Sequence, residues 1–310
     1  MANAALSRSD VHSDAILSNY VQRDYAPQNM IGFQMAPAIQ VNKESDIYYK
    51  KVTDKKHRNT LRAPGAPAGV VDISFGKGSY FCEEYAQASV LPSRIRENSD
   101  SILGLEKAKA QQAKDSVWLD MEIRIKDLAE SCSYSNAASA PWNGALITPD
   151  PQLDIDTAMY NVYGRIGQMP NRIKLPVKAI MALDRYLKAA ANISNPMSLT
   201  QRMESLENLW GLKVIPIFSQ YDKAAMGQPE VLTQIWTATE AIVFYAEEVP
   251  SLEAQGWLQT FACRFKTGTW QRVRTWYDDK SDADYYEFSI LAQPQVTNPL
   301  AAEKITTLLS

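Results

Sequence analysis

The chain has 310 residues, of which 45% are hydrophobic, enough to build a sizeable core without disulfide or metal staples. Its formal charge of -3 argues against attraction of the whole surface to nucleic acid, although it does not exclude local basic patches. No apolar run approaches the roughly 18 residues that a membrane span requires, and the N-terminus lacks the apolar segment of a signal peptide. Length alone favours about two domains.

Residues suited to catalysis are scarce. The two histidines, His12 and His57, lie among charged residues and are expected at the surface, although general-base and zinc chemistry rely on histidine. No phosphate-binding glycine motif, C-x-x-C pair or G-x-S-x-G sequence occurs. Three widely spaced cysteines predict reduced thiols. The best metal candidate, the aspartate-rich run 278–284, lacks the glycine and distal glutamate of a calcium loop, so a hairpin turn is favoured.

Residues 1–40 form a mixed segment. A short helix is expected over 11–23, and an apolar stretch broken by proline and glycine follows it. This stretch contains Ile31 and Phe33. It is typical of an extended arm that packs against another surface, such as a neighbouring subunit.

Within residues 41–92, apolar and polar residues alternate in the way that is typical of β-strands. Strands are expected over 71–75 and 80–85, with Gly76-Lys77-Gly78 as a tight turn between them. The piece over 54–69 is charged, then rich in proline and glycine, and has no apolar face. It should protrude as a long loop or hairpin. One interpretation is a flexible, solvated loop, and the other is a basic arm that docks on an acidic surface of an adjacent chain.

The strongest helical signal runs from Ser99 to Cys132, where apolar residues follow three- and four-residue steps. Two acid-before-base pairs at i,i+4, Asp120 with Arg124 and Glu122 with Lys126, should support it from the surface. A helix of roughly 33 residues would be about 50 Å long. Because heptads are not sustained, we expect it to lie along a sheet instead of forming a coiled coil.

A linker rich in small and polar residues over 134–152 precedes a mixed α/β third of the chain. Helices are expected over 153–168, 179–191 and 199–210, and strands over 173–177, 212–218 and within 233–246. The final fifty residues predict antiparallel strands around 261–265, 270–277 and 286–290.

This order of parts resembles the major capsid proteins of tailed bacteriophages, which have the Hong Kong 97-type fold. Tyr80-Phe81-Cys82-Glu83-Glu84-Tyr85, followed by Arg94-Ile95-Arg96-Glu97-Asn98, looks like the join of the family's hairpin loop and spine helix. Trp270–Asp278 with Tyr285–Ile290 looks like its closing strands. The resemblance implies an α+β chain with an N-terminal arm (1–40), an extended β-hairpin loop (41–95), a spine helix and first peripheral part (96–150), an axial α/β domain (151–260), and peripheral strands with a C-terminal tail (261–310).

The resemblance also implies a structural protein and not an enzyme. Such subunits self-assemble into hexamers and pentamers of an icosahedral shell that encloses phage double-stranded DNA without reading its sequence. The implied partners are further copies of the chain, a separate scaffolding protein, a portal protein and in some cases a decoration protein; no membrane and no cofactor is implied. The implied location is the virion, after assembly in the host cytoplasm. Contacts between subunits are expected at Lys50, Lys51, Lys55, Lys56, Arg58, Arg62, Arg94, Arg96, Ile31 and Phe33.

Two alternatives stay open. An encapsulin-like nanocompartment shell protein of the same fold should have a shorter hairpin and no long N-terminal arm. A metal-dependent hydrolase would use the aspartates of 278–284. No Lys–Asn crosslink is expected, because no activating carboxylate is evident near the loop lysines.

Overall fold

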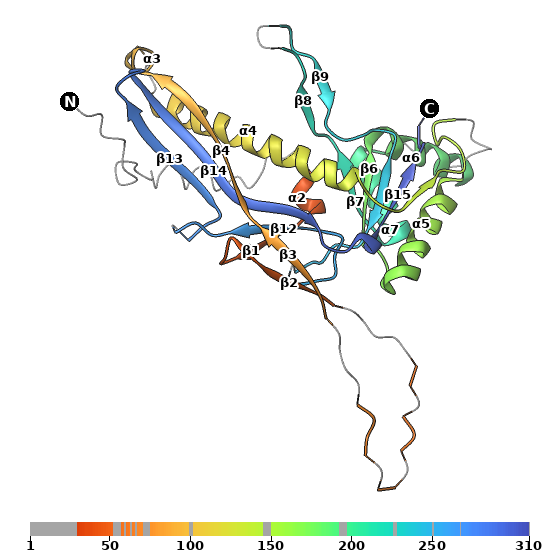
Figure 1. Cartoon of the computed structure of the whole chain (residues 1–310). Helices are drawn as coiled ribbons and strands as arrows, with labels where there is room; N and C mark the ends of the chain where they lie inside the picture. Colours follow the sequence, from red (N-terminus) through yellow and green to blue (C-terminus); the bar gives the residue numbers. More distant parts are fainter. Residues whose placement is uncertain are drawn as a thin grey trace.

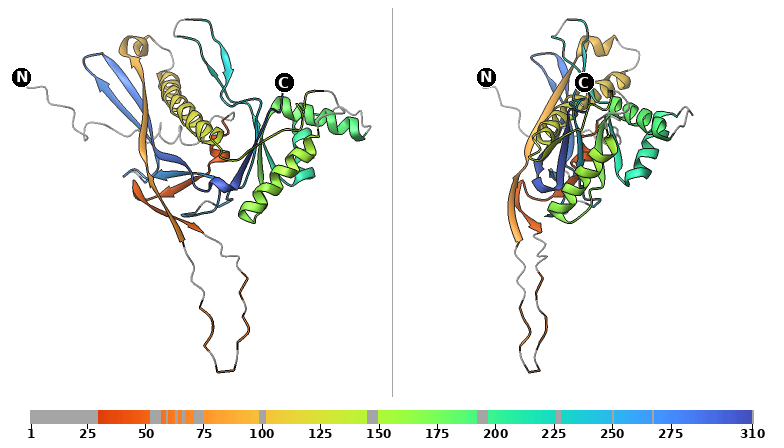
Figure 2. Two further views of the ribbon diagram at one scale, coloured as in Figure 1. Left: turned by 45° about the vertical axis from the view of Figure 1, so that its right-hand side comes forward. Right: turned by 90° about the vertical axis from the view of Figure 1, so that its right-hand side faces the viewer.

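A computed structural model describes residues 30–51, 57–58, 60–62, 64–65, 67–70, 75–98, 102–144, 150–191, 197–225, 228–249, 251–266 and 268–309. The body has two parts, a peripheral sheet with a long helix along it and an axial sheet with its own helices (Figure 1). Seen after a 90° turn, the molecule is much narrower (Figure 2). The helix expected over 11–23 lies outside the described residues. No helix in the described ranges combines the length and apolar character needed to cross a bilayer.

The peripheral sheet is built around one long strand. Strand β14 pairs antiparallel with β13 and β12 and, along its other side, with β4, while β1 pairs parallel with β12. The strand bounds are β1 Ala38–Val41, β4 Glu83–Pro92, β12 Leu258–Cys263, β13 Gln271–Asp278 and β14 Ala283–Val296. The β13–β14 hairpin closes with Asp278 opposite Ala283, which confirms the turn expected over 278–284.

Helix α4 (Ile102–Glu130) lies along β14 and β4, as the sequence predicted for a long helix on a sheet. The apolar side chains at three- and four-residue steps, Val117, Met121 and Ile125, are all buried. Val117 and Met121 pack with the sheet around Trp118 and Phe288, and Ile125 packs in the adjoining cluster beside Ile31. Over this stretch the periodicity therefore identified the correct helix face. Two short helices flank this layer, α2 (Gly32–Met35) before β1 and α3 (Ser93–Glu97) after β4.

The axial sheet has the order β5-β15-β10-β6-β7. Its strands and the helices against it are β5 Ser135–Ala137, β6 Arg172–Pro176, β7 Lys213–Ile217, β10 Ala241–Phe244, β15 Ala302–Thr306, α5 Pro151–Ile166, α6 Val177–Ala191 and α7 Leu199–Trp210. Local signals set the helix ends: Ser198 and Gln201 form a capping box, and Gly211 ends α7 at a φ of 66°.

The sheet topology corrects the expected domain boundaries. Strand β15 lies in the segment 261–310, which was expected to hold peripheral strands and a C-terminal tail, but it pairs with β10 and β5 of the axial sheet. Strand β5 was part of the expected linker and belongs to the same sheet. The linking 3₁₀ turn Pro299–Ala301 brings the chain from β14 back to the axial part, a crossover that strand patterning alone does not indicate.

Two projecting hairpins complete the fold (Figure 1). Strand β2 (Ser45–Lys51) pairs antiparallel with β3 (Phe75–Phe81) and parallel with β11 (Glu253–Ala254). We call β2 and β3 the stalk, because the expected loop begins where they end. Strands β8 (Gln220–Asp222) and β9 (Leu232–Gln234) form the second hairpin, beside the axial sheet.

Candidate assembly surfaces

The stalk is anchored to the body by aromatic packing. The ring of Tyr80 stacks on Phe261 of β12 with centroids 4.5 Å apart, and Tyr48 packs on the same ring at 5.2 Å. Both tyrosine side chains are at least 95% buried. Because side chains alternate along a strand, this anchors one face of the stalk and leaves the other outward.

The outward face of the stalk exposes several apolar side chains among the polar residues Ser45, Lys77 and Ser79. Ile47 is 47% exposed and Phe81 is 57% exposed, and Tyr49 lies on the same face at 45%. Leu252, beside β2, is 43% exposed, and its carbonyl accepts a hydrogen bond from the backbone nitrogen of Tyr49. We call Ile47, Tyr49, Phe81 and Leu252 the stalk patch. Large apolar side chains that gather at the surface in this way favour a site that another protein covers.

The expected turn at Gly76-Lys77-Gly78 is wrong, since all three residues lie inside β3. The reason is a tertiary contact: the ring of Tyr48 lies directly over Gly78, and a Cβ there would come within 2.5 Å of ring carbons. Glycine therefore makes room for an aromatic side chain from the paired strand instead of bending the chain.

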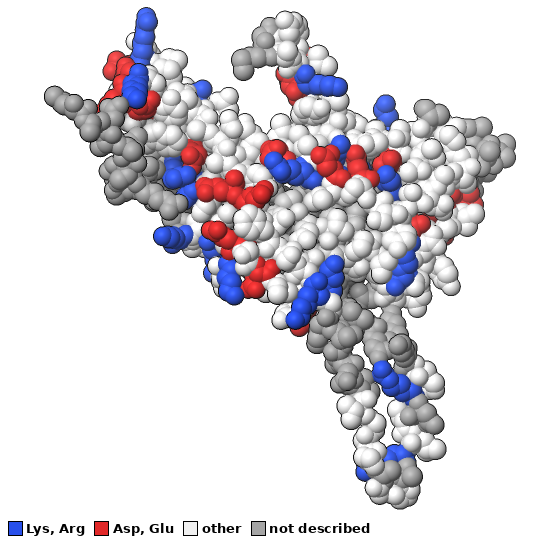
Figure 3. Space-filling model, viewed as in Figure 1, with Lys and Arg blue, Asp and Glu red and all other residues white. Residues whose placement is uncertain are grey.

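Of the basic residues expected to contact a neighbour here, Lys50 lies near the end of strand β2, and Arg58 and Arg62 lie in the loop beyond it. Lys50 lies over the Tyr48 ring, with Nζ 5.8 Å from the centroid. Arg58 and Arg62 are exposed, and the charged side chains described on the projecting loop are basic (Figure 3). Lys55 and Lys56, and the side chain of Lys51, lie outside the described residues. The predicted contacts of these residues with a neighbouring chain stay predictions.

Helix α3 follows the end of β4 that lies away from the stalk, and its two arginines, Arg94 and Arg96, differ in their contacts. Arg94 is exposed on α3. Arg96 pairs within the chain, with Asp284 at 2.8 Å and Glu106 at 3.6 Å, and so ties α3 to the β13–β14 hairpin and to α4. Arg96 therefore already has carboxylate partners, whereas Arg94 points to solvent.

Ile31 and Phe33 depart from the expected arm. Ile31 is 3% exposed, and Phe33 packs edge-on against Trp118 with centroids 4.8 Å apart. Both lie in the core where α2 meets α4, so the end of the expected arm, from residue 30 on, is part of the body of its own chain. Their apolar character indicated burial correctly, but the surface that buries them is internal.

A buried carboxylate that the sequence did not indicate joins α4 to three other segments. Glu122 is 1% exposed and accepts hydrogen bonds from the backbone nitrogens of Ile31 (3.0 Å) and Gly32 (2.6 Å). It also accepts from the Ser219 hydroxyl at 3.1 Å and the Trp236 indole at 2.6 Å. Burial raises the pKa of Glu122, while the four hydrogen bonds oppose that rise.

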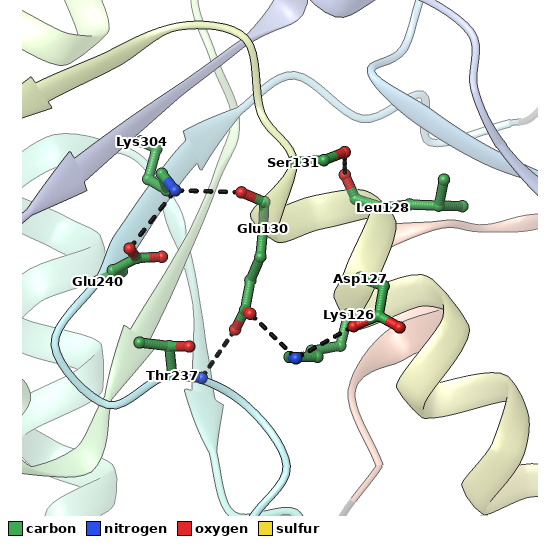
Figure 4. Close-up of polar contacts among 8 residues, drawn as sticks. All are labelled: Lys126, Asp127, Leu128, Glu130, Ser131, Thr237, Glu240 and Lys304. Atoms are coloured by element: carbon green, nitrogen blue, oxygen red, sulfur yellow. Dashed lines mark hydrogen bonds and ion pairs between the residues drawn. The ribbon is translucent and has the colours of Figure 1, made fainter.

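The expected surface pair of Glu122 with Lys126 is therefore wrong, while Asp120 and Arg124 do pair, at 2.8 Å. Lys126 instead pairs with Glu130 at 3.1 Å, near the end of α4 (Figure 4). Glu130 also accepts from the backbone nitrogen of Thr237 at 2.9 Å. Burial acts to raise the pKa of Glu130, but Thr237 and Lys126 lower it overall.

Candidate chemical sites are sparse in the described part of the chain. No group of three or more metal-ligating side chains occurs among the described residues. In the 278–284 turn, Asp278 accepts from the Ser281 hydroxyl at 2.7 Å, and Asp282 accepts from the Tyr277 hydroxyl at 2.6 Å. Through these hydrogen bonds the two carboxylates stabilise the turn, which is a common role of aspartate in turns.

Solved structures share this architecture over nearly the whole chain. A phage-related protein from Bordetella bronchiseptica RB50 aligns with a TM-score of 0.70 at 21% identity, covering 96% of this chain and 98% of that one. The capsid structure of the cyanophage P-SCSP1u aligns with a TM-score of 0.53 at 8% identity, over 100% and 92% of the two chains. The holo-SrpI encapsulin complex from Synechococcus elongatus gives 0.53 at 12% identity, over 98% and 92%. No family model and no curated protein matched the sequence. The chain therefore has the Hong Kong 97-type fold, the α+β architecture that its sequence predicted.

Proposed function

We propose that this chain is a major capsid protein, which self-assembles into the hexamers and pentamers of an icosahedral head shell around phage double-stranded DNA. The observation that carries the proposal is the stalk, whose one face is anchored on Phe261 while its stalk patch is left uncovered. The shared fold with a cyanophage capsid supports the same role. The role is structural, with no catalytic chemistry assigned to any residue.

The proposal assigns the uncovered surfaces to neighbouring copies. The stalk patch and the basic loop would contact the next subunit, with Lys50, Lys51, Lys55, Lys56, Arg58 and Arg62 facing its carboxylates. Arg94, exposed on α3, is a second such contact. A separate scaffolding protein, a portal protein and in some cases a decoration protein would complete the particle, which assembles in the host cytoplasm and persists as the virion.

A nanocompartment shell is the second candidate, because an encapsulin complex shares the fold at a similar TM-score. The two functions differ in content: a head shell holds DNA, whereas a nanocompartment holds protein cargo. Nuclease-protected DNA in particles from infected cells would favour the first, and its absence from intact particles would favour the second.

Negative-stain microscopy of the purified chain tests the shared part of both proposals. Wild type should form ring-shaped capsomers or closed shells. Deleting residues 54–69 should leave circular dichroism near native and destabilise the shells, because the sequence of this segment is charged, then rich in proline and glycine, with no apolar face to add to the core. Ile47→Asp should leave the chain folded and prevent assembly, while Ile47→Val serves as the matched control. A chain that stays monomeric at high concentration would contradict a shell function.

A further inference from the structure

Lys174 is buried in the axial sheet, and its ammonium has no hydrogen-bond partner among the described residues. Its side chain is 0% exposed and lies between Ile215 of β7 and Ile242 of β10. Removing an unpaired ammonium from water costs several kcal/mol. A methionine would fill the same space without that cost. Lys174 therefore destabilises the fold in this arrangement, and a purely structural role gives no reason for it.

Lys174 is the surplus cation of a small charged cluster. Two carboxylates, of Glu130 and Glu240, and two ammonium groups, of Lys126 and Lys304, act on it electrostatically. Among these groups Glu130 pairs with Lys126 at 3.1 Å and Glu240 with Lys304 at 3.4 Å (Figure 4). Each described carboxylate of the cluster is thus paired with a lysine other than Lys174. The Lys174 ammonium has no carboxylate within hydrogen-bond distance among the described residues.

Lys174 and Glu130 contact adjacent residues of one short link between β9 and β10. The Lys174 ammonium lies 4.9 Å from the centroid of the Trp236 ring, and the Glu130 carboxylate holds the backbone nitrogen of Thr237 at 2.9 Å. Glu122, about two turns earlier on α4, holds the indole of Trp236. Helix α4 therefore holds this link at two points, through Glu122 and Glu130, and the buried Lys174 contacts the same link at Trp236.

We propose that the junction between α4 and the axial sheet is a two-position switch, in which Glu130 holds Thr237 and Lys126 here and pairs with Lys174 in the second position. A carboxylate released from Thr237 in a buried junction needs a new partner, and Lys174 can supply one. Two alternative sets of contacts are what a bistable interface requires. Such a switch would let one subunit fit positions of different curvature in a shell. This use of the switch rests on the proposed function.

Hydrogen exchange on the purified full-length chain tests the switch through the amide of Thr237. Burial lowers the pKa of Lys174 to about 8, so its charge is present at pH 7 and largely lost at pH 9. At pH 7, protection of peptides covering Thr237 should be about tenfold lower in wild type than in Lys174→Met, because a charge-assisted pair stabilises the open position. At pH 9 the two should converge. Lys174→Arg, which keeps its charge, should stay low at both pH values.

Two controls separate the switch from a merely strained lysine. Peptides from α6 report general stability, so a parallel change there and at Thr237 would mean that Lys174 acts only on global unfolding. Glu130→Gln removes the exchanging carboxylate and should abolish the difference between wild type and Lys174→Met. Equal protection of Thr237 in those two chains at pH 7, with Glu130 intact, would overturn the proposal. Failure to form particles would count against the shell function alone.

Discussion

Replacing Glu122 by glutamine removes the carboxylate that ties α4 to the start of α2 and to two links of the axial part. The Oε1 atom accepts from Ile31, Ser219 and Trp236, and the Oε2 atom accepts from Gly32. A glutamine amide keeps one oxygen and replaces the other with a donor. In its better orientation, the amide oxygen takes the place of Oε1 and the amide nitrogen faces the N–H of Gly32.

The expected loss follows from that geometry. One buried N–H is left unpaired, which costs about 1–3 kcal/mol, and the remaining hydrogen bonds lose the strength that a charged acceptor gives, about 1 kcal/mol in all. We therefore expect Glu122→Gln to lower the free energy of unfolding by about 3 kcal/mol. The opposite amide orientation would leave three donors unpaired and lower it further.

Urea denaturation of the unassembled chain at pH 7 measures this difference. Asp120→Asn is the matched control, because Asp120 lies on the same helix but pairs with Arg124 at the surface, where an ion pair contributes less than about 1 kcal/mol. A Glu122→Gln chain that lost no more stability than Asp120→Asn would refute the assignment of Glu122 as a structural tie.

Three further outcomes follow from packing and charge. Gly32→Ala should lower stability by about 1–3 kcal/mol in the same urea assay, because the new Cβ would lie 2.5 Å from the Glu122 carboxylate; no loss would show that α2 shifts freely. Val117→Asp or Met121→Asp should prevent folding, seen as loss of helical circular dichroism, since both positions are buried against the sheet; a soluble, folded variant would contradict the helix face. Folding lowers the pKa of Lys174 from its usual value of 10.5 to about 8. Between these two pH values the unfolded state therefore binds more protons than the folded state. Stability should therefore rise by up to about 3 kcal/mol across that interval and stay flatter in Lys174→Met, with Lys178→Met, at an exposed position, as the control.

Elements whose signals are local were predictable from the sequence. Helix α7 spans Leu199–Trp210, the range expected from the sequence, and α4 begins and ends within three residues of the expected limits. Apolar steps also identified the buried face of α4. These predictions depend on hydrogen bonds and periodicity within a single segment, so no knowledge of the rest of the chain is needed.

Features set by distant contacts were not predictable in this way. Gly78 suggests a turn until Tyr48 is known to lie across it, and Glu122 suggests a surface ion pair until three distant segments converge on it. Lys174 sits in an apolar strand run with no local sign that its amine is unpaired. The deciding contacts of Gly78 and Glu122 come from residues far along the chain, and the burial of Lys174 depends on strands that pair with its own, so spacing along the chain does not show which segments meet.

The stalk shows that a local pattern can still carry functional information. Ile47, Tyr48 and Tyr49 are consecutive, so a strand through them must place apolar side chains on both faces. The body covers only Tyr48, by packing it on Phe261, and leaves Ile47 and Tyr49 about half exposed. The stalk is extended only by the two-residue strand β11, and so small a sheet is marginal by itself in water. Its second face therefore gains stability when another surface covers it. Tyr48 thus anchors the stalk to its own chain, while Ile47 and Tyr49 beside it place apolar side chains on the face that the body leaves exposed.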